Sequence, residues 1–298
     1  MNNKVLLGAL EGGGTKMVCA VGYADGTILK RESVPTTTPE ETLPKLARFF
    51  RNEGIAALGI GSFGPVDLHE DSETYGYITS TPKLDWIDTP FLPVLHDALN
   101  VPVGFETDVN MAAIGEHALG AGQGLANMVY VTVGTGIGAG IIVDNKPLHG
   151  LVHPETGHLL LKPDAAETHP DGFCPYHKGC LEGLASGPAI EKRWNRRADE
   201  LPPDHPAWRL EAEYLAQYCA NMIFTLSPER IILGGGVMHQ LHLFEPIRKR
   251  VVDLLGGYIR SSRILDDTAD YIVPPGLGDN SGTVGGFILA DKSLRNAR

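Results

Sequence analysis

The stretch at residues 4–21 reads KVLLGALEGGGTKMVCAV. One apolar run closes at Leu10, three glycines stand at positions 12–14, and a second apolar run opens at Met17. Short apolar runs bounded by glycine are typical of strands that are joined by a tight turn. An Asp25-Gly26 pair, which favours a hairpin, leads into a third run from Thr27 to Val34. The stretch therefore predicts three consecutive strands with a glycine turn between the first and the second.

The same pattern returns at residues 128–143, which read MVYVTVGTGIGAGIIV. An apolar run, a Gly-Thr-Gly interruption at 134–136 and a second apolar run again predict strand, turn and strand. A unit that recurs within one chain indicates two halves of related architecture. We therefore expect two related α/β lobes.

Helix signals alternate with the predicted strands. Thr38 is expected to cap a helix that has Pro39 at its first position and Glu41 closing a capping box. The order of elements predicts an α/β fold with two lobes of mixed sheet flanked by helices. We place the first lobe at residues 1–117 together with the returning C-terminal segment 283–298, and the second lobe at 118–282. Further helices are predicted at residues 108–119, 206–226, 242–255 and 279–289, and further strands at 55–60, 101–105 and 231–233.

Composition and charge limit the possible classes of function. The chain of 298 residues is 43% hydrophobic and 20% charged, which is typical of a folded globular protein. Its formal net charge is −11, and a nucleic-acid-binding role is not expected because such proteins need a basic face. No apolar run approaches the ~18 residues of a membrane span, and the start of the chain lacks a signal-peptide core. We expect a cytoplasmic protein with neither a nucleic-acid nor a membrane partner.

Three glycine clusters, at residues 12–14, 134–138 and 234–236, each follow a predicted strand. Glycine lets the backbone approach a phosphate closely and turn its N–H groups toward it. Thr15 and Lys16 add a hydroxyl and a positive charge to the first cluster. Each cluster alone is equally compatible with a simple turn, but three clusters at strand ends favour a nucleotide-binding site. None matches the Walker pattern, and the second cluster leads into a strand, whereas a dinucleotide-binding fingerprint opens a helix.

A possible metal site lies in the loop-rich segment at residues 148–187. Cys174, His177 and Cys180 follow the spacing Cys-x2-His-x2-Cys, and Zn²⁺ prefers four sulfur and nitrogen ligands in tetrahedral geometry. His158 is the best candidate for the fourth ligand, with His153 and His169 as rivals. Incidental thiols and surface histidines are the alternative, and a closed set of four ligands would make the site structural.

Several carboxylates stand on predicted polar turns. Asp108 follows a predicted strand and opens a predicted helix, where the positive end of the helix dipole favours its ionised form. Such a carboxylate can accept the proton of a hydroxyl that attacks phosphorus, although the spacing alone favours an ordinary N-cap role at this position. Glu155 and Glu182 flank the possible metal segment, where they could accept hydrogen bonds from sugar hydroxyls.

Taken together, these segments resemble the ROK family of sugar kinases and related repressors, within the wider actin-like ATPase fold. The resemblance covers nearly the whole chain, and its motifs are highly specific only in combination. They are the phosphate loops Glu11–Lys16 and Gly134–Gly140, the Gly-Pro-Val-Asp loop within Ser62–Asp67, the catalytic segment Thr107–Ala113, the sugar and metal motifs Glu155–His158 and Gly179–Glu182, and the nucleotide segments Ser186–Pro188 and Gly234–Val237.

The resemblance implies a two-lobed fold of the actin-like ATPase (ribonuclease H-like) type and phosphoryl transfer from ATP to a hexose, with Asp108 as the catalytic base. The sugar contacts that it implies are Gly64, Asp108, Glu155, His158 and Glu182. The residues that it implies at ATP are Gly12, Gly13, Gly14, Thr15, Lys16, Thr132, Gly134, Thr135, Gly136, Pro188, Gly235, Gly236 and Val237. It further implies a Mg²⁺ that accompanies ATP, a homodimer, and a structural Zn²⁺ on His158, Cys174, His177 and Cys180.

Three departures from the family pattern bear on the choice of sugar. Glu11 stands where the first loop commonly has Asp, and Thr107 stands where Asn commonly precedes the catalytic Asp. The metal motif is Cys-x2-His-x2-Cys instead of Cys-x-Cys-x4-Cys. The Glu-type loop and the His-containing motif resemble the bacterial fructokinase branch, which implies conversion of D-fructose to D-fructose 6-phosphate. The alternatives are a glucokinase, a mannokinase, an N-acetylhexosamine kinase or a catalytically silent sugar-sensing protein.

Overall fold

The computed structural model describes residues 4–297 of the chain. These residues form two compact units. The first contains the chain up to Gly124, the segment Lys146–Pro154 and the end of the chain from Asp279. The second contains Leu125–Asn145 and Glu155–Gly278.

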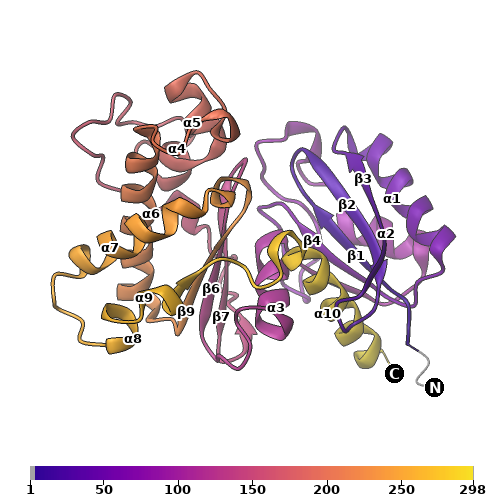
Figure 1. Cartoon of the computed structure of the whole chain (residues 1–298). Helices are drawn as coiled ribbons and strands as arrows, with labels where there is room; N and C mark the ends of the chain where they lie inside the picture. The colour runs from indigo at the N-terminus through magenta and orange to yellow at the C-terminus, as the bar shows by residue number, and fades with distance from the viewer. Residues whose placement is uncertain (1–3, 298) are drawn as a thin grey trace. The chain divides into compact units, whose positions relative to one another are not determined.

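The first sheet has the strand order β3-β2-β1-β4-β5 (Figure 1). Its first three strands are antiparallel neighbours, as the glycine and Asp-Gly turns predict, whereas β4 and β5 run parallel to β1. The register places Gly12 beside Ser62 and Ser62 beside Thr107, so the three parallel strands end at one edge of the sheet. The strands are β1 (Leu7–Gly12), β2 (Lys16–Gly22), β3 (Ile28–Pro35), β4 (Leu58–Ser62) and β5 (Val103–Thr107).

Alternation of side chains along β1 explains why helices cover both faces of this sheet. Leu7 and Ala9 point to one face, where they form a buried cluster with Phe287 of α10. Leu10 points to the other face, into a larger core that includes Leu46 of α1. The helices of this unit are α1 (Pro39–Glu53), α2 (Phe91–Leu99), α3 (Asp108–Leu119) and α10 (Ser281–Asn296).

Two helices of the first unit, α3 and α10, pack backbone to backbone through glycines. A side-chain carbon on Gly285 would lie 1.7 Å from the carbonyl oxygen of Met111, and one on Gly115 would lie 2.2 Å from that of Ser281. Only glycine permits so close an approach. This packing fixes α3, and with it the first residue of that helix, Asp108, against α10.

The second unit repeats this plan. Its sheet has the order β10-β9-β6-β7-β8, which matches the order β5-β4-β1-β2-β3 of the first sheet. β6 pairs antiparallel with β7 across the turn at residues 134–136 and parallel with β9, so the recurrence predicted from the glycine turns is confirmed in the topology. The strands of this sheet that lie in the second unit are β6 (Met128–Val133), β7 (Ile137–Val143), β9 (Arg230–Gly234) and β10 (Ile272–Val273). The two-residue edge strand β8 (Lys146–Pro147) stands in the segment Lys146–Pro154, which is counted with the first unit. The helices are α4 (Leu181–Ala185), α5 (Gly187–Trp194), α6 (Ala207–Leu226), α7 (Phe244–Leu255), α8 (Ser262–Leu265) and α9 (Thr268–Tyr271).

Two helix ends differ from the sequence predictions. Thr38 occupies the N-cap of α1 but its side chain makes no capping hydrogen bond, so the predicted capping box with Glu41 is wrong. The buried hydroxyl of Thr42 is engaged there instead and accepts the N–H of Thr37 at 3.2 Å. The last helix continues to Asn296, beyond its predicted end at residue 289, because no glycine or proline follows to stop it.

The apolar interior accounts for two of the four cysteines. Cys19 and Cys219 stand in apolar stretches of the sequence and are fully buried free thiols. Burial raises the pKa of each thiol to about 12, which keeps both protonated and unreactive.

No helix within residues 4–297 combines the length and the apolar character that crossing a membrane requires.

Candidate functional site

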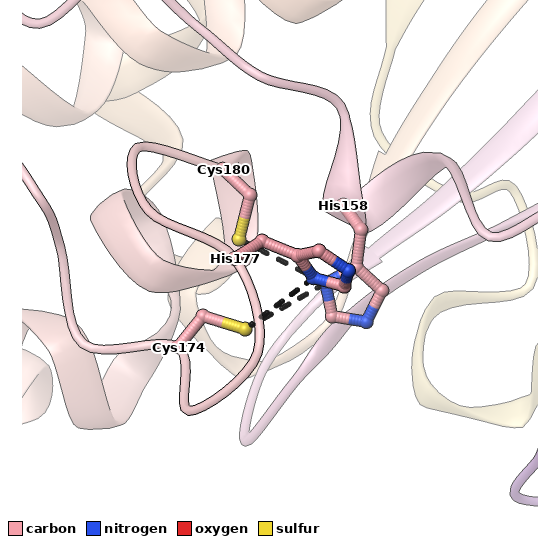
Figure 2. A group of neighbouring side chains, drawn as sticks. All are labelled: His158, Cys174, His177 and Cys180. Atoms are coloured by element: carbon pink, nitrogen blue, oxygen red, sulfur yellow. Dashed lines mark hydrogen bonds between the residues drawn. The ribbon is translucent and has the colours of Figure 1, made fainter.

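Four side chains of the second unit converge on one point (Figure 2). The Sγ atom of Cys174 lies 3.9 Å from the Nδ1 atom of His158 and 3.7 Å from that of His177. The Sγ atom of Cys180 lies 3.8 Å from the Nδ1 atom of His158, and all four donor atoms lie within 4.8 Å of one another. The structure thus brings together the four residues that the sequence indicates as a metal-binding set.

The spacing of these donor atoms suits a tetrahedral divalent metal. With metal–sulfur bonds of about 2.3 Å and metal–nitrogen bonds of about 2.0–2.1 Å, tetrahedral angles separate sulfur and nitrogen ligands by roughly 3.5 Å. The observed separations of 3.7, 3.8 and 3.9 Å need only small side-chain shifts to reach that value. Two thiols and two imidazoles form a soft to borderline donor set, unlike the oxygen ligands that magnesium and calcium prefer. Four protein ligands leave no open position, which is typical of a structural metal centre.

Backbone geometry holds the loop that carries these donors. Cys180 is the N-cap residue of α4, and its Sγ atom accepts the N–H of Gly183 at 3.4 Å. It also forms a β-bridge with Leu160, two residues after His158, which ties two of the four ligands side by side. Gly179 has a φ of +69°, a backbone conformation that other residues rarely adopt, at the turn that leads into Cys180.

The two rival histidines are engaged elsewhere. In the first unit His153 is buried, and its Nε2 atom accepts the backbone N–H of Val66 at 3.1 Å. Burial lowers the pKa of His153, which favours the neutral ring that this acceptor role requires. In the second unit the Nδ1 atom of His169 lies within hydrogen-bonding distance, 3.0 Å, of the Thr168 hydroxyl. Neither histidine belongs to the four-donor cluster.

In the first unit, the parallel strands deliver three polar segments to one edge of the sheet. Gly12, Ser62 and Thr107 end β1, β4 and β5 in register. The first glycine loop follows β1, Gly64 follows β4, and Asp108 follows β5. In this unit, the residues predicted to contact phosphate, sugar and the reacting hydroxyl therefore follow neighbouring strand ends. The carboxyl ends of parallel strands are where α/β proteins bind ligands.

The first glycine loop is anchored at its base by Thr36. The Thr36 hydroxyl donates to the carbonyl oxygen of Gly13 at 2.7 Å, and its N–H donates to that of Thr15 at 3.0 Å. Thr15 and Lys16 are exposed, and a side-chain carbon on Gly14 would meet nothing nearer than 3.5 Å. An anchored loop with open space beside Gly14 can present backbone N–H groups to an anion.

In the second unit, three predicted nucleotide segments meet at the end of β6. The N–H of Gly187 donates to the carbonyl oxygen of Gly134 at 2.8 Å. Gly235, with a φ of +89°, packs so closely that a side-chain carbon there would lie 2.5 Å from the carbonyl oxygen of Val133. The structure thereby assembles the segments that contain Thr132, Gly134, Thr135, Gly136, Pro188, Gly235, Gly236 and Val237.

Asp108 is the first residue of α3 and is not the N-cap of this helix. The cap is Thr107, whose hydroxyl oxygen accepts the N–H of Asn110 at 3.1 Å, so the alternative of Asp108 as the N-cap is wrong. The Oδ1 atom of Asp108 accepts the N–H of Val109 at 2.9 Å. The side chain therefore lies at the positive end of the helix, where a carboxylate is favoured over the neutral acid.

A buried carboxylate two residues before Asp108 has no counterpart among the sequence predictions. The Oε2 atom of Glu106 accepts a hydrogen bond from the side-chain amide of Asn110 at 2.9 Å, and its Oε1 atom lies 2.8 Å from the Nε2 atom of His149. The hydrogen bond with Glu106 raises the pKa of His149. The sequence offers only a weak signal for Glu106, namely a polar residue near the end of a buried strand. Its partner His149 is 43 residues away, and no spacing rule connects Glu106 with His149.

Glu155 and Glu182 lie at the two ends of the metal-binding loop. The Oε2 atom of Glu182 accepts the N–H of Ile137 at 3.0 Å, a contact with the second glycine loop that the sequence does not indicate. Desolvation by the surrounding protein, with the charge of Glu182 as the second cause, raises the pKa of Glu155 to about 7. Both side chains can accept hydrogen bonds from hydroxyl groups.

The matching strand orders, the glycine loops at strand ends and the carboxylate that opens α3 define an α/β protein of the actin-like ATPase fold. Its structure is similar to that of a ROK family glucokinase from Streptomyces griseus in complex with glucose and AMPPNP, with a TM-score of 0.77, 28% identity, and coverage of 97% of this chain and 100% of that one. The structure is also similar to that of a ROK hexokinase from Thermus thermophilus, with a TM-score of 0.74 and 29% identity. This alignment covers 98% of this chain and 99% of that one.

The ROK family model matches residues 7–293, and the chain belongs to the ROK family. A fructokinase from Pediococcus pentosaceus is 45% identical over 293 residues, which cover 98% of this chain and 100% of the relative. A fructokinase from Zymomonas mobilis is 43% identical over 297 residues, which cover 97% of each chain. The resemblance inferred from the motifs is therefore confirmed over nearly the whole chain.

We expect His149→Gln to reduce thermal stability more at about pH 6 than at about pH 9. Contact with Glu106 raises the pKa of His149, so its stabilising charge is fully present below the unfolded value of about 6.5 and is lost as pH rises through the folded value. Unfolding temperatures of both proteins across this range measure the effect. His96→Gln, at an exposed histidine of α2, is the control, and an equal loss of stability at both pH values would contradict a charged interaction.

Proposed function

We propose that the chain is an ATP-dependent fructokinase that phosphorylates D-fructose to D-fructose 6-phosphate. The observation that carries this proposal is the identity of 45% and 43%, over nearly the full length, with fructokinases from two bacteria. The placement of Asp108 supports it, because the residue opens α3 at the edge where the parallel strands of the first sheet end.

Asp108 is the proposed catalytic base. Its carboxylate accepts the proton of the sugar 6-hydroxyl as the hydroxyl oxygen attacks the γ-phosphorus of ATP. The bond between the γ-phosphorus and the β,γ-bridging oxygen breaks, and ADP leaves with that electron pair. The N-terminal end of α3 favours the ionised form that this step requires. The remaining contribution is positioning and charge, since phosphoryl transfer asks for little covalent chemistry from the protein.

The glycine loops are proposed to bind ATP through backbone N–H groups, with added hydroxyl groups and the positive charge of Lys16. The residues assigned to ATP are Gly12, Gly13, Gly14, Thr15 and Lys16 in the first unit, and Thr132, Gly134, Thr135, Gly136, Pro188, Gly235, Gly236 and Val237 in the second. A Mg²⁺ ion would accompany ATP and would supply positive charge against the charge of its phosphates. The residues assigned to the sugar are Gly64, Asp108, Glu155, His158 and Glu182.

The four-donor cluster is proposed to hold a structural Zn²⁺. The donor set of two thiols and two imidazoles, and sulfur–nitrogen separations close to tetrahedral values, support this metal. When bound, the ion cross-links the loop that carries Glu155 and Glu182. By analogy with the family, we further propose a cytoplasmic homodimer.

A glucokinase is the second candidate. It is favoured by the structural similarity to the Streptomyces griseus glucokinase that was solved with glucose, at a TM-score of 0.77. The sequence identity of 28% to that enzyme is well below the 45% shared with the Pediococcus pentosaceus fructokinase, and this difference supports fructose.

Fructose should give the highest kcat/KM among fructose, mannose, glucose and N-acetylglucosamine. A wrong sugar leaves hydroxyl-binding groups such as Glu155 and Glu182 unpaired, which rejects it more strongly than the loss of an apolar contact. Initial rates of ADP release at saturating MgATP measure the preference. A value about tenfold higher for glucose or mannose would contradict fructose and leave a sugar kinase, whereas no release with any sugar would favour a sensing protein.

Asp108→Asn should leave folding and nucleotide binding largely intact and lower kcat by roughly 10²–10⁴-fold. The amide has nearly the same shape, and the helix cap survives because Thr107 provides it, but the amide cannot accept the hydroxyl proton. Steady-state kinetics and thermal unfolding test both halves of this expectation, with Asp97→Asn on the surface of α2 as the control. Retention of more than about a tenth of the wild-type kcat would point to another base.

Protein purified without added metal should contain about one zinc ion per chain. Elemental analysis measures this content, and Cys174→Ser combined with Cys180→Ser should abolish it. Cys19→Ala is the matched control, because this buried thiol belongs to the core of the first unit and not to the donor cluster. A zinc content near zero in the wild type, or an undiminished content in the double variant, would contradict the site.

A further inference from the structure

Glu182 links the metal-binding loop to the second glycine loop. It stands two residues after Cys180, in the first turn of α4, and its Oε2 atom accepts the N–H of Ile137 at 3.0 Å. A side-chain carbon on Gly136 would lie only 2.8 Å from the same oxygen. The carboxylate therefore lies directly against the backbone of the glycine loop, all within the second unit.

Two backbone contacts attach neighbouring segments to the same glycine loop. The N–H of Gly187, which follows α4, donates to the carbonyl oxygen of Gly134 at 2.8 Å. Gly157, in the short 3-10 helix Thr156–His158, packs so closely that a side-chain carbon there would lie 1.8 Å from the carbonyl oxygen of Ile137. The glycine loop is thus held from two sides by the segments on which the metal-binding residues stand.

The position of these segments depends on the donor cluster. Between His158 and Cys180 the described chain has no helix or strand element, only turns and a single β-bridge from Leu160 to Cys180. A metal bound by the four donors closes this irregular loop on itself and fixes Cys180. Because Cys180 is the N-cap of α4, its position also sets that of Glu182.

A structural role for Glu182 explains an otherwise unfavourable placement. A carboxylate beside a loop that binds phosphate repels the ligand, which would favour a neutral or basic residue at this position. The hydrogen bond to the Ile137 N–H gives the carboxylate a backbone partner and fixes the end of the loop at the start of β7. A loop that is already ordered binds more tightly, because the ligand does not have to supply the free energy of ordering.

We propose that metal binding at the His158–Cys174–His177–Cys180 cluster orders the second glycine loop for phosphate binding, and that Glu182 is the positioning residue that transmits this order. The inference rests on the proposed function, since the ligand of the loop is the phosphate chain of ATP. It adds a role for the metal in nucleotide affinity that is separate from sugar binding.

The test measures the Kd of MgADP in the absence of sugar, for the metal-loaded protein and for the protein stripped with a chelator. Glu182→Ala removes the acceptor and should weaken MgADP binding by roughly tenfold in the metal-loaded form, about the worth of one net hydrogen bond. Glu182→Gln retains an acceptor of the same reach and should restore nearly wild-type affinity. Glu191→Ala, at an exposed residue of α5, is the matched control and should change nothing.

A thermodynamic cycle distinguishes coupling from independent effects. Metal removal should weaken MgADP binding by the wild type about as much as Glu182→Ala does, and should weaken binding by the Ala variant little further. Hydrogen exchange at the Ile137 amide gives a local readout that does not depend on activity. Its protection should fall in the Ala variant and after metal removal, and should persist in the Gln variant.

Three results would overturn the inference. Unchanged affinity in Glu182→Ala would show that the contact does not order the loop, and tighter binding by both the Ala and the Gln variants would show that charge repulsion dominates. Additive losses from the Ala substitution and from metal removal would show that the metal acts by another route. Failure of the wild type itself to bind MgADP would overturn the proposed function as well, which separates the two cases.

Discussion

In-register pairing of parallel strands determines where this chain can carry out chemistry. Residues along β1 and β4 are almost entirely buried, so the polar side chains of these two strands are confined to the strand ends. Pairing of Gly12 with Ser62, and of Ser62 with Thr107, brings three ends to a common edge. In the second unit Thr132 pairs with Gly234 in the same way. Each glycine loop, and the carboxylate that opens α3, begins where such a strand stops.

Features with a local cause could be predicted from the sequence, whereas contacts between distant segments could not. The limits of β6 and β7 agree with the prediction because an apolar run and a glycine turn mark both ends. Three ligands of the donor cluster lie in one short motif, which made that cluster recognisable as well. The contact of Glu106 with His149 spans 43 residues, and that of Glu182 with Ile137 spans 45. Both depend on how loops return to a sheet, which no local pattern encodes.

Thr107 shows that a departure from a family pattern can preserve the local physics and still change the site. Its hydroxyl accepts the N–H of Asn110 and caps α3, a role that threonine and asparagine both perform well. The start of the helix, and with it the position of Asp108, is therefore maintained. The polar group beside Asp108 does change, because a short hydroxyl that already caps the helix stands where the family commonly has a longer carboxamide. Under the proposed function, such a position can alter sugar preference without moving Asp108, the proposed base.

The carboxyl groups around the candidate sites are stabilised in different ways, and the difference suits their surroundings. Glu106 bonds to an amide and an imidazole, while Asp108 and Glu182 each accept a backbone N–H. Desolvation and the charge of Glu182 raise the pKa of Glu155 to about 7, which favours the protonated carboxyl group that can donate as well as accept. Glu182 can then act as a hydrogen-bond acceptor, and a protonated Glu155 as both donor and acceptor. Sugar hydroxyls likewise both donate and accept hydrogen bonds, so the pair suits the proposed sugar ligand. Protonation of Glu155 also limits the negative charge near loops assigned to an anionic nucleotide, in a chain whose net charge is already −11.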